Sequence, residues 1–180
     1  DTQGCDSSKD LITHAQKQFP NLRFQIADLG SPLPYPQESQ DVIVLNMAAT
    51  DLENLENSYK NLNLLLKPNG KLIVTIPNPA TAFPAGVWKR NIFDVLLGRK
   101  PKLQIRPIPP NAKSLVTSWD HKTSTSFYYS LSEHINAVTK NGFALTELCE
   151  LQSKVDSQKY NMRYRLYRFP LLLLLEFKKL

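Results

Sequence analysis

The order of apolar and polar positions along the chain predicts alternating helices and strands. Apolar residues recur at steps of three and four from Leu52 to Leu66, which is the spacing of one buried helix face. The run Val42–Leu45 is continuously apolar and rich in β-branched residues, which is typical of a strand buried on both faces. Further helices are predicted near 8–19 and 130–141, and further strands at 22–26, 72–76, 143–151 and 170–178.

Polar residues at the predicted helix ends indicate where each helix begins. Ser7–Asp10 and Ser130–Glu133 both have the spacing of a capping box. Asp51 is expected to cap the helix between them, and Pro68–Gly70 is expected to end that helix with a left-handed position at the glycine. His134 directly follows the second cap and is therefore expected to be exposed.

The sequence of elements predicts an α/β fold with one domain at 1–180. Helix, strand, strand, helix and strand follow one another with short connections, which favours a parallel sheet with crossover helices. Prolines then become frequent, and residues 80–130 are interpreted as an insertion that holds a short helix at 88–97 and a hairpin of 114–118 with 125–129. The insertion follows a strand end, where ligands bind in such sheets.

Composition and charge limit the class of protein. The chain has 180 residues, 42% of them apolar and 21% charged, which is typical of a globular domain. The net charge is +6, and the densest basic stretch, 85–106, is interpreted as a solvated surface of the insertion, so a nucleic-acid partner is not expected. The longest apolar run is far too short to span a bilayer, so no membrane is expected. Two cysteines favour a reducing compartment, and a cytoplasmic location is expected.

Several common sites are missing from the sequence. The six glycines form neither G-x-G-x-x-G nor a phosphate-binding P-loop. The two cysteines and three histidines are isolated from one another, so no metal is expected. No serine lies in a G-x-S-x-G motif.

Polar side chains at strand ends are the remaining candidates for chemistry. Asp6 precedes the first predicted helix, Asp28 follows the strand 22–26, and Asn46 follows Val42–Leu45. Such residues meet at the carboxyl edge of a parallel sheet, where a carboxylate can accept hydrogen bonds from a ribose or an exocyclic amine. Taken alone, each aspartate is better explained as a helix cap or turn residue, whereas the three together favour a ligand site.

Five stretches of the chain carry, in order, a resemblance to one family. They are GCDSSKDLITHAQ at 4–16, FQIADLGSPLPYPQESQDVIVLNMAATDLENLE at 24–56, NLLLKPNGKLIVTIPNP at 63–79, FYYSLSEHINAVTKNGFALTELCEL at 127–151 and RFPLLLLLEFKKL at 168–180. Each resembles a block of the class I S-adenosylmethionine-dependent methyltransferases. The third block is similar to LLKPGG-x-L, with Asn69 in place of the first glycine. Residues 80–125 lie outside the resemblance.

The resemblance implies a fold, a cofactor and a reaction. The implied fold is Rossmann-like, a mainly parallel twisted sheet with helices on both faces and an antiparallel closing strand. The implied reaction is methyl transfer from S-adenosylmethionine to a small-molecule acceptor by in-line displacement. By the same resemblance, Asp6 with Ser7 meets the ribose hydroxyls, Asp28 with Leu29 meets the adenine, and Asn46 with Met47 lies against the methionine part.

The resemblance also implies a segment that the sequence does not contain. In the family, a strand and a glycine-rich loop come before the position of Asp6, whereas only five residues precede it here. The chain is therefore expected to be a fragment, and a strand with a glycine-containing loop is expected upstream.

The acceptor side and the alternatives depend on the insertion. Trp88, Tyr128 and Tyr129 are expected to line the acceptor beneath a lid formed by 80–130, although these aromatic residues could equally anchor the insertion to the sheet. No catalytic residue is assigned. The alternatives are a nicotinamide-dependent oxidoreductase, against which the closing strands 143–151 and 170–178 count, and a non-catalytic or nucleic-acid-modifying member of the same fold.

Overall fold

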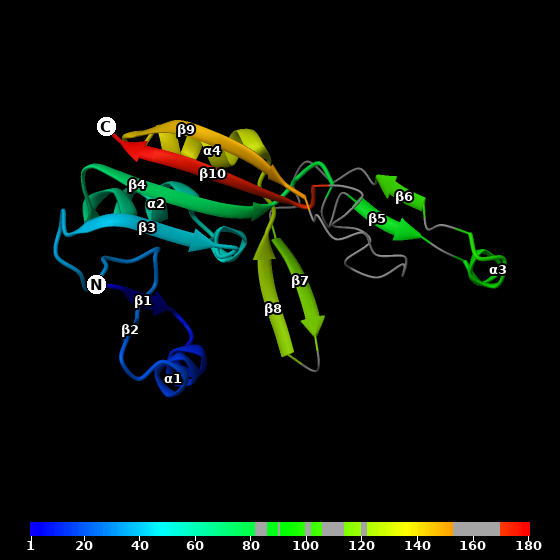
Figure 1. Ribbon diagram of the computed structural model, residues 1–180, viewed down its shortest axis with the longest axis horizontal. Helices are drawn as coiled ribbons and strands as arrows, with labels where there is room; N and C mark the ends of the chain where they lie inside the picture. Colours follow the sequence, from blue (N-terminus) through cyan, green and yellow to red (C-terminus); the bar gives the residue numbers. More distant parts are fainter. Residues whose placement is uncertain (82–85, 90, 100–101, 106–113, 120–121, 153–169) are drawn as a thin grey trace.

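Two sheets, each containing one parallel pair of strands, form the framework of the molecule. The computed structural model describes residues 1–81, 86–89, 91–99, 102–105, 114–119, 122–152 and 170–180. One sheet has the strand order β3 (Gln40–Asn46), β4 (Leu66–Pro77), β10 (Leu172–Lys179) and β9 (Phe143–Leu151). Strands β3 and β4 are parallel, whereas β10 is antiparallel to both of its neighbours. A second sheet pairs β1 (Gln3–Asp6) with β2 (Arg23–Ile26) in parallel and lies below β3 in Figure 1.

The core lies between the larger sheet and two helices. Helices α2 (Leu55–Leu65) and α4 (Leu131–Thr139) pack against each other on the same side of that sheet (Figure 1). In β4 the alternate residues Leu72, Val74 and Ile76 are fully buried, as are the alternate residues of β10 that face the same core. Helix α1 (Lys9–Gln18) instead packs on β1 and β2.

Only one of the three predicted helix caps is at the expected residue, although α1 begins near residue 8 as predicted. The capping box of Ser130 and Glu133 opens α4 as predicted. The prediction for Ser7 is wrong, because the side chain of Ser8 accepts the hydrogen bond from the Leu11 backbone at the start of α1. The prediction for Asp51 is also wrong. That residue ends the short 3-10 helix η1 (Ala49–Asp51), and α2 is capped by Asn54.

Two predictions of burial are also corrected. Strand β3 is not buried on both faces, since Val42 is 48% and Val44 61% exposed while Leu45 is buried. The reason is that side chains alternate along β3, so Ile43 and Leu45 pack on the core while Val42 and Val44 lie on the opposite face. His134 is not exposed but 2% accessible, because it lies on the inward side of α4.

The turn from α2 into β4 uses the predicted residues in different roles. The helix ends at Leu65, and β4 starts at once with Leu66. Asn69, not Gly70, has the positive φ, at 63°. Gly70 is required for space, since a Cβ there would lie 2.9 Å from the carbonyl oxygen of Lys67.

The insertion contains more strand than predicted. Strands β5 (Gly86–Lys89) and β6 (Lys102–Ile105) pair antiparallel, and α3 (Ile92–Leu96) between them is shorter than the predicted helix at 88–97. The predicted hairpin is confirmed as β7 (Ser114–Trp119) and β8 (Lys122–Phe127), and Tyr128 and Tyr129 follow β8. Figure 1 shows β5, β6 and α3 extending away from the sheet. Nowhere in the described ranges is a helix long and apolar enough to cross a bilayer.

Candidate functional site

A cavity of about 630 Å³ opens between the two sheets. It is lined by β1, by the loop that follows β2, by β3 and the segment that follows it, and by Leu62 and Leu65 of the helix α2. Five of the six residues predicted to hold a cofactor line it, namely Asp6, Ser7, Asp28, Leu29 and Asn46. The sixth, Met47, is not among the lining residues. Its backbone has a φ of 58°, and its side chain is partly exposed.

Asp6 stands where β1 ends and α1 begins. One carboxylate oxygen, Oδ1, accepts a hydrogen bond of 2.8 Å from the backbone N–H of Ser8. The main-chain carbonyl of Asp6 accepts from the N–H of Ala27, 3.1 Å away, which extends the pairing of β1 with β2. The aspartate thus has the turn role expected of such a residue, and its exposed carboxylate also lines the cavity.

Asp28 organises the loop after β2. Its carboxylate accepts hydrogen bonds from the N–H of Gly30 at 2.9 Å and the hydroxyl of Ser31 at 3.3 Å. Two asparagines of α2 hold the same loop from the other side. Asn57 donates to the carbonyl of Gly30 at 2.6 Å, and Asn61 donates to that of Leu29 at 2.9 Å. The loop is therefore fastened to α2, with Leu29 packed against the core.

Asn46 is fixed by the neighbouring strand. Register pairs it with Thr75, whose hydroxyl donates to Asn46 Oδ1 at 2.5 Å. The backbone N–H of Met47 donates in turn to the carbonyl and the hydroxyl of Thr75, each at 3.0 Å. The contact with Thr75 therefore fixes the orientation of the Asn46 amide at the edge of the cavity.

Asp51 is a site residue that sequence reasoning missed. It lines the cavity beside Asp6, and it also lines a second cavity of about 960 Å³. Partial desolvation and the negative charge of Asp6 raise the pKa of Asp51, and a hydrogen bond with the side chain of Ser126 opposes this effect. The partner Ser126 is on β8, far away in the sequence, so no local pattern marks Asp51 as more than a helix cap.

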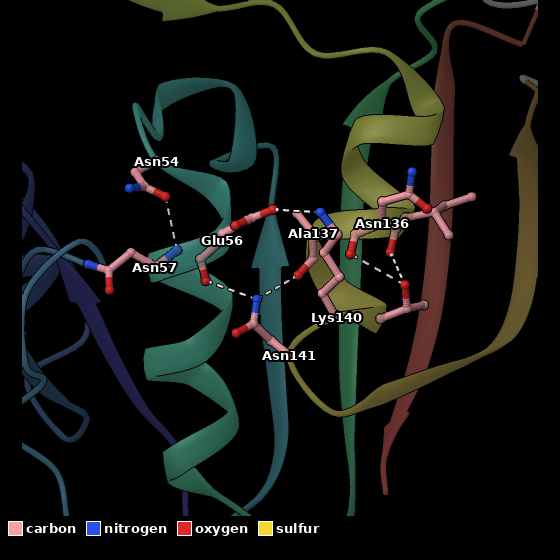
Figure 2. A network of polar contacts seen from close by, with 9 residues as sticks. Asn54, Glu56, Asn57, Asn136, Ala137, Lys140 and Asn141 are labelled. Carbon is pink, nitrogen blue, oxygen red and sulfur yellow. Dashed lines mark hydrogen bonds and ion pairs between the residues drawn. The ribbon is translucent and has the colours of Figure 1, made fainter.

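The second cavity lies over the amino-terminal part of α2 and over the side of α4 that carries Glu133, Asn136 and Ala137. Its described lining contains five acidic residues and one basic residue, Lys140. Lys140 Nζ lies 3.2 Å from Glu56 Oε1, and Asn141 donates to the carbonyls of Glu56 and Ala137 at 3.1 and 2.8 Å (Figure 2). These contacts fix the two helices relative to each other and leave the cavity with an excess of negative charge.

The three residues predicted on the acceptor side have different surroundings. Tyr128 donates a hydrogen bond of 3.4 Å to the carbonyl of Pro79. Tyr129 lines the second cavity and donates to the carbonyls of Leu52 and Glu53. Trp88 lies in β5, and its side chain is outside the part of the chain that the structure describes. Within that part, no group of three potential ligands is arranged for a metal ion.

The arrangement of these strand ends agrees with a match to a known family. A family model described as "Methyltransferase domain" matches residues 2–151. The chain belongs to this family. Among curated relatives of the methyltransferase domain, trans-aconitate 2-methyltransferase of Sinorhizobium medicae is 28% identical over 144 residues, which cover 76% of this chain and 55% of the relative. The enzyme of the same name from Escherichia coli O139:H28 is 27% identical over 171 residues, 88% of this chain and 65% of the relative. The chain thus spans less than two thirds of either relative.

A solved structure confirms the fold of this methyltransferase domain. An S-adenosylmethionine dependent methyltransferase from Mesorhizobium loti superposes with a TM-score of 0.73 at 23% identity, covering 98% of this chain and 79% of that one. The Rossmann-like fold predicted from the sequence is therefore confirmed. The family match also argues against the nicotinamide-dependent oxidoreductase.

Proposed function

We propose that this methyltransferase domain binds S-adenosylmethionine in the 630 Å³ cavity and serves methyl transfer to a small-molecule acceptor. The observation that carries the proposal is the meeting of Asp6, Asp28 and Asn46, from three separate strand ends, at one cavity. Its volume is in the range of small-molecule and cofactor sites. The names of the relatives, which are methyltransferases, support the same activity.

The donor groups of the cavity fit that cofactor. Asp6 would accept hydrogen bonds from the ribose hydroxyls and Asp28 from the adenine amine, with Leu29 packed on the ring. The NH₂ of Asn46 would lie toward the methionine part. Asp6, Asp28 and Asp51 are all acidic, and the cavity has no lysine or arginine among its described lining residues, which suits a cofactor with a cationic sulfonium.

The cofactor supplies an activated methyl group, so the chain itself needs to bind, orient and exclude water. The fixed loop at Asp28 and the fixed end of β3 at Asn46 provide orientation, which lowers the entropic part of the barrier. The acceptor is proposed to be a small molecule. We do not propose trans-aconitate as the acceptor of this chain. A tricarboxylate would be repelled by the acidic residues that line both cavities. The cytoplasmic location stays a prediction.

Titration calorimetry with S-adenosylhomocysteine, the demethylated product, tests the proposal. The wild-type chain is expected to bind, and Asp6→Ala is expected to weaken binding roughly 10- to 150-fold, the loss for hydrogen bonds to a charged group. Asp10→Ala is the matched control, since Asp10 is an exposed acid in the first turn of α1 and does not line the cavity. No binding by the wild-type chain would refute the proposal, and equal affinity in Asp6→Ala would leave Asp6 with its turn role only.

A further inference from the structure

The hydroxyl of Tyr129 joins the end of the insertion to the segment that follows β3. Its oxygen lies 2.8 Å from the carbonyl oxygen of Leu52 and 2.7 Å from that of Glu53. Both carbonyls belong to the short connection between η1 and the N-cap of α2. A phenol has one proton, so the two carbonyls share it and the hydroxyl has no second proton for an acceptor.

The ring of Tyr129 is held in place by the core. It meets the ring of His134 edge to face, with centroids 5.6 Å apart, and packs against the buried cluster beneath α2 and α4. Burial, followed by the charges of Glu133 and Glu53, raises the pKa of the Tyr129 hydroxyl. The group therefore stays protonated and remains a donor at neutral pH.

The segment 48–53, which contains this connection, forms one side of the proposed cofactor cavity. Ala48, Asp51 and Leu52 all line it. Asp51 also has a hydrogen bond with the side chain of Ser126 in β8, three positions before Tyr129. Two side chains at the end of the hairpin thus hold residues 51–53 from the same direction, and β8 contacts η1 directly.

We propose that Tyr129 is a positioning residue that holds the segment 48–53 in place as a side of the cofactor cavity. The hydroxyl acts through the backbone of Leu52 and Glu53 and does not touch the cofactor or the acceptor. A movement of the hairpin on acceptor binding would then change cofactor affinity, and linkage requires the reverse effect as well. The role in binding rests on the proposed function, whereas the restraint on the segment does not.

Two readouts on the full chain test this inference with Tyr129→Phe. Hydrogen exchange of the amides at 48–54 reports the segment directly, and calorimetry with S-adenosylhomocysteine reports the cavity. Phenylalanine keeps the ring packing and removes only the donor. Exchange at 48–54 is expected to quicken, and affinity to fall, each by roughly three- to tenfold, the effect of one hydrogen bond. Tyr128→Phe is the matched control, because its hydroxyl donates to Pro79 and not to this segment.

The outcomes separate the inference from the proposed function. Unchanged exchange at 48–54 in Tyr129→Phe would overturn the inference, whether or not the cofactor binds. Faster exchange that extends through β4 and β10 would also overturn it, because that pattern means global destabilisation. Faster local exchange with unchanged affinity would overturn the link to the cavity. A wild-type chain that fails to bind S-adenosylhomocysteine would refute the proposed function. Hydrogen exchange at 48–54 would then still decide whether Tyr129 restrains this segment.

Discussion

The side chain of Lys179 caps the carboxyl end of α2, and removal of its ammonium group should destabilise the whole domain. A helix leaves its last carbonyls without partners inside the helix. Lys179 Nζ donates to the carbonyls of Asn63 and Leu66 at 2.9 and 2.8 Å. The carbonyls between these two accept from the backbone N–H groups of Glu38 and Ser39, each at 2.9 Å. The ammonium also lies at the negative end of the helix dipole.

The magnitude follows from the burial of this contact. The Lys179 side chain is 12% exposed, so its two hydrogen bonds are poorly replaced by water. Lys179→Met keeps the length of the side chain and leaves two partly buried carbonyls without a donor. We expect a loss of about 2–4 kcal/mol in the free energy of unfolding. The ion pair with Glu38, 3.7 Å away and exposed, adds little.

Urea unfolding and thermal melting of the two variants Lys179→Met and Lys178→Met measure this contribution. Lys178 is the exposed neighbour on β10 and has no such contact with α2. For a domain of this size, the expected loss corresponds to a melting temperature lower by roughly 5–15 °C. If Lys179→Met melts within about 2 °C of Lys178→Met, the carbonyls are hydrated and the assigned role of the ammonium is refuted.

Two buried polar groups give the remaining predictions. Burial lowers the pKa of His134 from 6.5 to about 4, so the unfolded chain binds the proton first. The free energy of unfolding is therefore highest above pH about 6.5, and it falls by up to about 1.4 kcal/mol per pH unit toward pH 4. Urea unfolding of His134→Gln at several pH values should show that this pH dependence is lost. The fully buried hydroxyl of Tyr59 has no hydrogen-bond partner among the described residues, so Tyr59→Phe should stabilise the domain by about 1 kcal/mol, and a clear loss in urea unfolding would contradict this.

Local chemistry predicted element types better than element boundaries. The capping box at Ser130 was identified correctly because both of its members lie within four residues. At α1 two adjacent serines offered the same cap, and the choice of Ser8 depends on the carboxylate of Asp6 that accepts the Ser8 N–H. At α2 the observed cap is Asn54 and not the predicted Asp51, because the short helix η1 lies between β3 and α2. Such choices depend on contacts that residue spacing does not contain.

The residues of the candidate site also differ in whether a local sequence pattern could predict them. Asp6, Asp28 and Asn46 were predictable because parallel strands bring their carboxyl ends to one edge. Asp51 was not, because its hydrogen bond with Ser126 joins residues that are far apart in the sequence. The predicted role of Tyr129 at the acceptor stays untested, but its hydroxyl contacts backbone carbonyls instead of open space. Side chains that act through a distant backbone leave no periodic pattern in a sequence.

Helix α2 is the element on which the proposed cavity depends. Asn57 and Asn61 hold the loop after β2, the carbonyls just before the helix accept from Tyr129, and its last turn is closed by Lys179. Loops from both sheets are therefore attached to one rigid helix, which keeps the strand ends at fixed separations although the two sheets share no ladder. A helix attached at both ends and along one side transmits displacement as a rigid unit. Leu62 and Leu65 of α2 also line the cavity, so a change at the carboxyl end of the helix should reach the cavity directly as well as through the loop that Asn57 and Asn61 hold.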